Sequence, residues 1–187
     1  MIRSFLAIEI PKAIQEKIEE VQKDLRSSYA DVRWVNPEKM HLTLKFFGSI
    51  EEPRIDPITQ SIAGPIRTTS PFSIKVRGVG AFPNLKNPRV IWMGLVDGKE
   101  VLIHFQKQLE EELKKIGFEP EGRAFHPHLT LGRMRSSKGR EELVGRIEKH
   151  QEEEFGVFQV ERVVLFKSDL RPTGPIYTSL RELRLGG

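Results

Sequence analysis

Two copies of one tetrapeptide hold the side chains best suited to chemistry. The sequence His-Leu-Thr-Leu occurs at residues 41–44 and again at residues 128–131. In an extended strand, side chains two residues apart point to the same face, so the histidine and threonine of each copy share one face and the leucines share the other. We expect the leucines to pack in the core. The histidines and threonines then remain available at a surface or a cleft.

Two imidazoles around one ligand can form an acid–base pair. Histidine titrates near neutrality, so one ring can take a proton from water while the other gives a proton to a leaving oxygen. Each role is typically worth about 10²–10⁴ in rate and needs no metal. With Thr43 and Thr130 to hold non-bridging oxygens, a phosphate ester suits the set, and we predict His41 and His128 as the catalytic residues. The alternative is that the repeated motif is only a duplicated strand, but matched positions in two repeats favour function.

The elements that must position these motifs also repeat. The first half predicts strands at residues 4–10, 41–47 and 72–79, a helix with apolar residues at 14, 18, 21 and 25, and a weaker helix at 57–66, interrupted by Gly64 and Pro65. The second half predicts strands at 90–95, 128–131 and 158–166, helices at 102–116 and 139–150, and a final strand at 177–185. His41 follows Phe5 by 36 positions, and His128 follows Ile91 by 37. We infer duplicated lobes with approximate two-fold symmetry.

Composition narrows the class of protein. A chain of 187 residues with 38% hydrophobic content can bury a core, and no long linker divides it, so we expect a single domain over residues 1–187. The 30 Lys and Arg residues nearly balance the 26 Asp and Glu residues, so any phosphate-binding surface must be local. The absence of cysteine excludes disulfides, cysteine-ligated metals and thiol catalysis. The apolar run at residues 5–10 is too short for a membrane span, and we expect a cytoplasmic protein with no membrane partner.

With its flanking residues, the chain resembles the RNA 2',3'-cyclic phosphodiesterase branch, also called the 2'-5' RNA ligase branch, of the two-histidine phosphoesterase superfamily. The resemblance covers nearly the whole chain. It rests on segments around both motifs, namely residues 3–7, 33–35, 41–48, 72–80, 90–92, 125–133, 165–170 and 174–177.

This resemblance implies an α+β, bilobal fold in which each lobe is an antiparallel sheet flanked by helices and both motifs lie in a groove between the lobes. It also implies an RNA partner that ends in a 2',3'-cyclic phosphate, with a tRNA half as one such substrate. His41 would protonate the 3'-oxygen leaving group and His128 would activate water, which yields a 2'-phosphate. The same groove can run in reverse as a 2'-5' RNA ligase. No cofactor and no obligate protein partner are expected.

Four further residues are candidates for substrate contacts. Arg133 offers a guanidinium fork to phosphate oxygens, but simple strand alternation places it on the leucine face unless the strand bulges near Gly132. Lys45 shares the His41 face under the same alternation, where it would contact the RNA backbone or remain solvated. Phe47 and Trp34 are candidates for stacking on a base, although packing in the core is the favoured explanation for both.

Position 126 departs from the pattern that the resemblance implies, because it holds histidine where we would expect arginine in many relatives. His126 and His128 form a His-x-His pair that could be read as two metal ligands. Without a nearby Asp, Glu or Cys in that segment, we predict no metal site.

Two alternatives to this function stay open. One is a non-catalytic RNA-binding module, against which the intact motifs argue. The other is a phosphodiesterase for a small cyclic nucleotide, which the same acid–base pair could cleave. A phosphate-loop motif is absent, so an ATP-dependent ligase of that kind is not expected.

Overall fold

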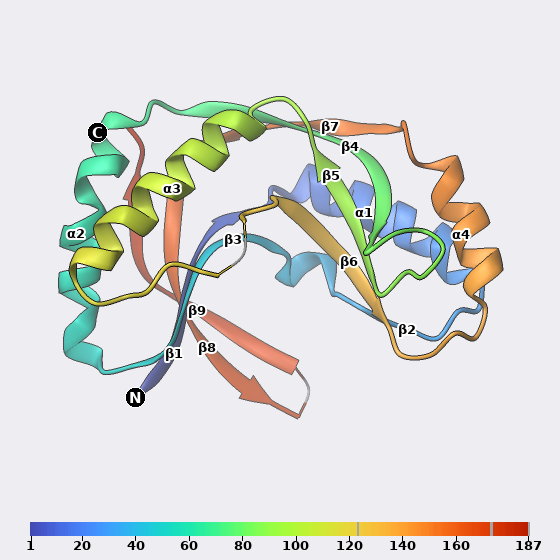
Figure 1. Ribbon diagram of the computed structural model, residues 1–187, viewed down its shortest axis with the longest axis horizontal. Coiled ribbons are helices and arrows are strands. Elements are labelled where there is room, and N and C mark those ends of the chain that lie inside the picture. Colours follow the sequence, from blue (N-terminus) through green and yellow to red (C-terminus); the bar gives the residue numbers. More distant parts are fainter. Residues whose placement is uncertain (123, 173, 187) are drawn as a thin grey trace.

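Two antiparallel sheets face each other, and each is covered on its outer side by two helices (Figure 1). The computed structural model describes residues 1–122, 124–172 and 174–186. The four-stranded sheet has the order β3 (His41–Ile50), β1 (Ile2–Glu9), β8 (Arg162–Arg171) and β9 (Gly174–Arg184). The five-stranded sheet has the order β2 (Val32–Trp34), β6 (His128–Met134), β5 (Val90–Leu95), β4 (Phe72–Phe82) and β7 (Glu154–Val160).

Four α-helices and two short 3₁₀ helices complete the described elements. Helices α2 (Ile55–Thr68) and α3 (Lys99–Lys115) pack together on the four-stranded sheet, and α1 (Lys12–Arg26) and α4 (Arg140–Lys149) pack together on the five-stranded sheet. The 3₁₀ helices are η1 (Pro37–Lys39), which precedes the first motif, and η2 (Glu52–Arg54), which follows its strand. The α+β architecture and the two lobes expected from the sequence are confirmed.

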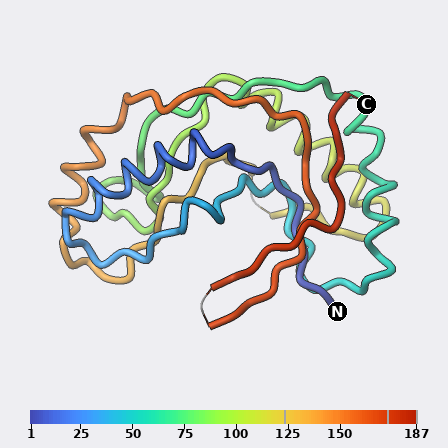
Figure 2. The backbone as a smooth tube through the Cα atoms, turned by 180° about the vertical axis from the view of Figure 1, so that it is seen from behind, coloured from blue at the N-terminus to red at the C-terminus, as the bar shows by residue number. Residues whose placement is uncertain are grey.

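The lobes interleave the two halves of the sequence. Strand β1 pairs with β3 from its own half and with β8 from the other half, and β5 likewise pairs with β6 and with β4. The helices cross over as well, because α1 of the first half lies in the lobe of the second motif and α3 of the second half lies in the lobe of the first. Figure 2 shows the N-terminal strand beside the two C-terminal strands. Each His-Leu-Thr-Leu motif therefore depends on elements from both halves.

Two expectations for individual elements were wrong. The run at residues 158–166 is not one strand: β7 ends at Val160, β8 begins at Arg162, and the two belong to different sheets. Helix α2 is not interrupted at Gly64 and Pro65 but continues to Thr68. Five buried residues on one helix face outweigh the hydrogen bond that Pro65 cannot donate, namely Ile55, Ile58, Ile62, Pro65 and Ile66. Part of the turn between β8 and β9, Thr173, lies outside the described residues.

The leucines of both motifs anchor their strands in the core, as expected. Leu42 and Leu44 are 2% and 3% exposed, and Leu129 and Leu131 are both 0% exposed. Burial of each such side chain stabilises the fold by about 1.5–3 kcal/mol. The cores of the two lobes thus hold the strands whose opposite faces present the histidines. Among the described residues, no helix combines the length and the apolar character needed to cross a membrane.

Candidate active site

A β-bulge interrupts each motif strand at the second leucine. Between β1 and β3, Leu6 pairs with Lys45 but the next residue pairs with Thr43, so Leu44 is the extra residue. Between β5 and β6, Ile91 pairs with Gly132 but the next residue pairs with Thr130, so Leu131 is the extra residue. A bulge inserts one residue and thereby reverses the alternation of the side chains that follow it.

This reversal decides which residues join the histidines. The fifth residue after each histidine, Phe46 in β3 and Arg133 in β6, lines the same cavity as the motif side chains. Arg133 therefore lies on the His128 face, because the strand bulges beside Gly132. Without the bulge, alternation would have placed it with the leucines.

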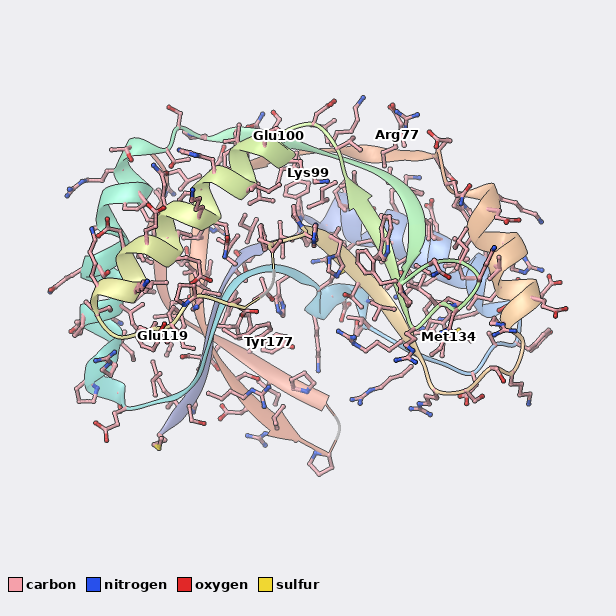
Figure 3. The ribbon with its side chains drawn as sticks, in the orientation of Figure 1. Arg77, Lys99, Glu100, Glu119, Met134 and Tyr177 are labelled. Atoms are coloured by element: carbon pink, nitrogen blue, oxygen red, sulfur yellow. The ribbon has the colours of Figure 1, made fainter. Side chains whose placement is uncertain are left out.

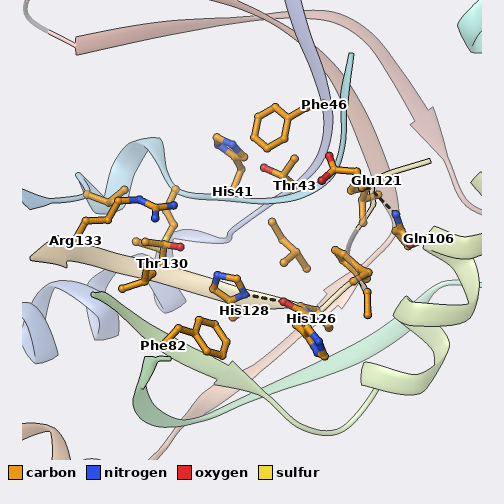
Figure 4. A pocket seen from close by; sticks show the side chains of 18 of the residues that line it. His41, Thr43, Phe46, Phe82, Gln106, Glu121, His126, His128, Thr130 and Arg133 are labelled. Carbon is orange, nitrogen blue, oxygen red and sulfur yellow. Dashed lines mark hydrogen bonds between the residues drawn. The ribbon is translucent and has the colours of Figure 1, made fainter. Parts of the chain in front are cut away.

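The cavity between the lobes has a volume of about 720 Å³ and brings the two motifs together. His41 and Thr43 line it from β3, and His128 and Thr130 line it from β6 (Figure 4). The predicted catalytic and phosphate-binding residues thus come from opposite walls of one groove. We refer to this cavity as the groove.

The two imidazoles are held in the same way. His41 donates from Nδ1 to the carbonyl oxygen of Lys39 at 3.1 Å, and His128 donates from Nδ1 to the carbonyl oxygen of His126 at 2.6 Å. A carbonyl can only accept, so in both rings Nδ1 holds the proton. In the neutral rings Nε2 is then the atom that can accept a proton, and in the protonated rings it can donate one.

The surroundings lower the pKa of both histidines. Burial lowers the pKa of His41 from its ordinary value of 6.5, and the hydrogen bond to Lys39 only partly opposes this. Burial also lowers the pKa of His128, where the hydrogen bond to His126 acts in the opposite direction and the positive charges of Arg133 and His126 lower it further. In the ligand-free protein at pH 7, both rings are therefore mainly neutral.

We expect NMR titration of the ring protons to give both histidines a pKa below 6.5 in the free protein. Inorganic phosphate should raise both values, because an anion in the groove favours the protonated rings. Since the folded state prefers the neutral rings, the two histidines should lower the free energy of unfolding as the pH falls below 6.5. A pKa above 6.5 for either groove histidine without phosphate would contradict this account.

Aromatic rings surround both histidines. Phe5 is 2% exposed and stacks on His41 with the ring centroids 4.5 Å apart. Tyr177 meets His41 in a T-shaped arrangement with the ring centroids 5.0 Å apart. Phe82 meets His128 edge-on at 5.1 Å. Figure 3 shows Tyr177 on the groove side of its sheet. The sequence analysis missed Phe46, Phe82 and Tyr177 as groove residues, because they reach it through a bulge and through strands that pair over long range.

The structure contradicts the expected position of Lys45. The bulge at Leu44 turns Lys45 away from the His41 face, and its side chain is 4% exposed. Its Nζ donates to Glu110 Oε2 at 2.7 Å and to the carbonyl oxygen of Glu119 at 2.6 Å. It is therefore neither solvated nor placed to contact the RNA backbone.

The two aromatic candidates lie on the core side of their strands, as the favoured packing explanation had it. Phe47 is 9% exposed and packs edge-on against Phe118 at 5.0 Å, and Phe46 beside it is the ring that is exposed in the groove. Trp34 packs against the hydrophobic core, and the guanidinium of Arg26 lies 5.2 Å from its ring. Neither Phe47 nor Trp34 lines the groove.

Side chains of opposite charge lie at the two ends of the groove. Arg133 lies at one end, and Glu121 lies near Thr43 at the other (Figure 4). His126 also lines the groove next to His128. In the part of the chain that the structure describes, no three His, Cys, Asp or Glu side chains gather closely enough to hold a metal ion.

Comparisons with known proteins agree with this geometry. A family model described as LigT like Phosphoesterase matches residues 8–92 and 95–177. The chain is 39% identical over 184 residues to the RNA 2',3'-cyclic phosphodiesterase of Methanothermobacter thermautotrophicus, covering 98% of this chain and 99% of that protein. It is 35% identical over 181 residues to the protein of the same name from Methanocaldococcus jannaschii, covering 97% and 99%.

Solved structures show the same fold. A crystal structure of a Thermus thermophilus protein matches with a TM-score of 0.81 at 28% identity, covering 99% of this chain and 98% of that one. The structure of Escherichia coli LigT complexed with 3'-AMP matches with a TM-score of 0.76 at 24% identity, covering 100% and 99%, which speaks to the fold alone. Sequence and fold agree over nearly the whole length: this chain belongs to the LigT-like phosphoesterase family.

Proposed function

We propose that this protein hydrolyses a terminal RNA 2',3'-cyclic phosphate to a 2'-phosphate by metal-independent acid–base catalysis. The observation that carries the proposal is the pair of imidazoles on opposite walls of one groove, each with Nδ1 fixed by a carbonyl oxygen and Nε2 left for proton transfer. The names of the full-length relatives support the choice of substrate.

The environments of the two histidines favour one assignment of roles. Burial lowers the pKa of His128, and the charges of Arg133 and His126 lower it further, so the neutral ring is free to take a proton. Burial alone lowers the pKa of His41, and no neighbouring positive charge adds to that effect. We therefore assign His128 as the base: it takes a proton from water, whose oxygen bonds to phosphorus as the bond from phosphorus to O3' breaks. His41 gives its proton to O3'. The products are a 3'-hydroxyl and a 2'-phosphate. The proton on His128 returns to solvent, and His41 takes up a proton again when the next anionic phosphate, which favours its protonated form, binds in the groove.

The remaining motif residues would hold the phosphate. The hydroxyls of Thr43 and Thr130 donate to the two non-bridging oxygens from opposite walls. Arg133 adds a charged fork that balances the negative charge as it grows in the transition state. Phe46 and Phe82, which are 54% and 37% exposed, offer ring faces to the terminal bases.

The charge along the groove indicates where the RNA strand leaves it. Arg33 in β2 pairs directly with Arg133 in β6, so their side chains share the groove face. Arg89 and Arg135 lie at the same end of the sheet, since the backbone carbonyl of Arg89 accepts from the amide of Met134, the residue between Arg133 and Arg135. All four side chains are exposed, and no carboxylate within the described ranges forms an ion pair with them. We name this set, Arg33, Arg89, Arg133 and Arg135, the arginine end of the groove.

We expect the double variant Arg89→Ala/Arg135→Ala to raise KM for an RNA of about ten nucleotides and to leave KM for adenosine 2',3'-cyclic monophosphate unchanged. Each phosphate contact to a single strand contributes about 0.7 to the slope of log affinity against log salt, so the slope for the longer RNA should fall by about 1.4. The matched control is Lys107→Ala/Lys114→Ala, which removes two charges from the exposed face of α3. Equal effects of the two double variants would exclude the arginine end as the RNA path.

One experiment tests the proposed function. Purified protein is incubated with EDTA and a short RNA that ends in a 2',3'-cyclic phosphate, and the position of the product phosphate is mapped. Formation of a 2'-phosphate is the expected result. Binding of the RNA without turnover would instead favour the non-catalytic module. Turnover of cyclic mononucleotides but not of the RNA would favour the small-substrate phosphodiesterase.

A further inference from the structure

A buried glutamine from a helix donates to the carbonyl of each bulged leucine. In the lobe of the second motif, Gln22 of α1 donates from Nε2 to the carbonyl oxygen of Leu131 at 3.0 Å. In the lobe of the first motif, Gln106 of α3 donates from Nε2 to the carbonyl oxygen of Leu44 at 3.2 Å. The two glutamines are 2% and 7% exposed. Each thus reaches the extra residue at which the pairing of its catalytic motif changes register.

The two glutamines occupy equivalent positions in the repeat. Three of the four buried apolar positions of α1 recur in α3 at an offset of 84 residues, and the offset between Gln22 and Gln106 is the same. The recurring pairs are Ile18 with Leu102, Val21 with Phe105, and Leu25 with Leu109. Because the helices cross over between the lobes, the glutamine of each half supports the motif of the other half.

Each glutamine also fixes a neighbour of its bulge. Gln22 Nε2 donates a second hydrogen bond to the carbonyl oxygen of Val35 at 2.8 Å, which ties the end of β2 to β6. Gln106 Nε2 donates to Glu110 Oε1 at 3.1 Å, and Glu110 accepts from Lys45, the residue that follows the bulged leucine. Hydrogen bonds from Gln106 and to Glu110 thereby hold Leu44 and Lys45 against α3. Lys45 also donates to the carbonyl oxygen of Glu119, which is labelled in Figure 3.

We propose that Gln22 and Gln106 are positioning residues that hold the two bulges in register and so aim the side chains of the catalytic strands into the groove. The proposal rests on the proposed function. Without its bulge a strand returns to simple alternation, and the side chains that follow the bulge turn to the other face. In β6 that would withdraw Arg133 from the groove, and in β3 it would exchange Phe46 with Lys45. The buried amide opposes this, because each carbonyl would lose its side-chain donor, and the carbonyl of Leu131 would keep only the backbone amide of Val35 at 2.9 Å.

The test uses Gln22→Met and Gln106→Met, which keep the length of the side chain and remove the donor. We expect each variant to lower kcat about 10- to 100-fold with KM changed less than about threefold, since small misplacements of catalytic groups have effects of this size. The ring signals should also move selectively: those of His128 in Gln22→Met and those of His41 in Gln106→Met. These signals need no turnover, so they test the positioning role even if the cyclic phosphate is not the substrate.

The matched control is Gln15→Met. Gln15 also lies on α1 and donates from Nε2 to a backbone carbonyl, that of Ile10 at 2.8 Å, but this carbonyl is outside both motif strands. Its variant should keep wild-type kcat and unshifted histidine signals. If a methionine variant does not fold, the asparagine variant, whose amide is one methylene too short, replaces it. Folded variants with a lower melting temperature, wild-type kcat and unshifted histidine signals would overturn the proposal and leave the glutamines a purely structural role.

Discussion

Replacing either His41 or His128 by alanine is expected to lower kcat for hydrolysis of the cyclic phosphate by about 10²–10⁴, in the presence of EDTA. Each variant removes one of the two proton transfers, and neither Thr43 nor Thr130 can replace it, because a hydroxyl does not titrate near neutral pH. The corresponding rise in the barrier is about 3–5 kcal/mol. The measurement is single-turnover hydrolysis of an end-labelled RNA, which separates chemistry from product release.

The double variant His41→Ala/His128→Ala shows whether the two histidines act in one transition state or contribute to the rate independently. If both histidines act in one transition state, the double variant should be little slower than the slower single variant, because residues that act as a unit are not additive. His104→Ala is the control, since His104 is exposed on α3 and does not line the groove. A single variant that keeps more than about a tenth of the wild-type activity would show that the replaced histidine is not a general acid or base in the reaction.

Removing Glu110 is expected to destabilise the protein by about 3–5 kcal/mol, the usual effect of leaving one partner of a buried ion pair uncompensated. The Nζ of Lys45 lies 2.7 Å from Glu110 Oε2, and the two side chains are 4% and 12% exposed. Without Glu110 the ammonium keeps the carbonyl of Glu119 as its acceptor but loses the opposite charge. Urea unfolding of Glu110→Ala against the wild type measures the difference.

Two comparisons isolate the effect of the buried charge. The double variant Lys45→Met/Glu110→Met removes both charges and fills the space, so it should recover most of the lost stability. Glu20→Ala breaks the exposed pair with Lys17, whose atoms are 2.8 Å apart, and should leave the unfolding midpoint almost unchanged. A Glu110→Ala variant as stable as the wild type would mean that Lys45 leaves the core without difficulty, in which case the bulge at Leu44 does not depend on this pair.

The architecture follows from local patterns where the pattern is strong. The spacing of apolar residues predicted α1 and α3, and the alternation in both motifs placed the four leucines in the core. The local pattern did not predict that residues 158–166 are divided between two sheets. Only one residue separates β7 from β8, so the sequence has no turn-rich segment to mark the boundary. Nor did it predict the helix through Pro65, where tertiary burial outweighs local preference.

For the site, the sequence by itself determined the two histidines and two threonines, because their type, spacing and repetition are local properties of the chain. Only the tertiary structure decided that Arg133 and Phe46 enter the groove and that Lys45 leaves it. A bulge arises from the pairing of one strand with another and from the donor that satisfies its carbonyl, and both partners are distant in sequence. Alternation along a single strand contains no information about such partners. It therefore predicts the correct face for the side chains before the bulge and the wrong face for those after it.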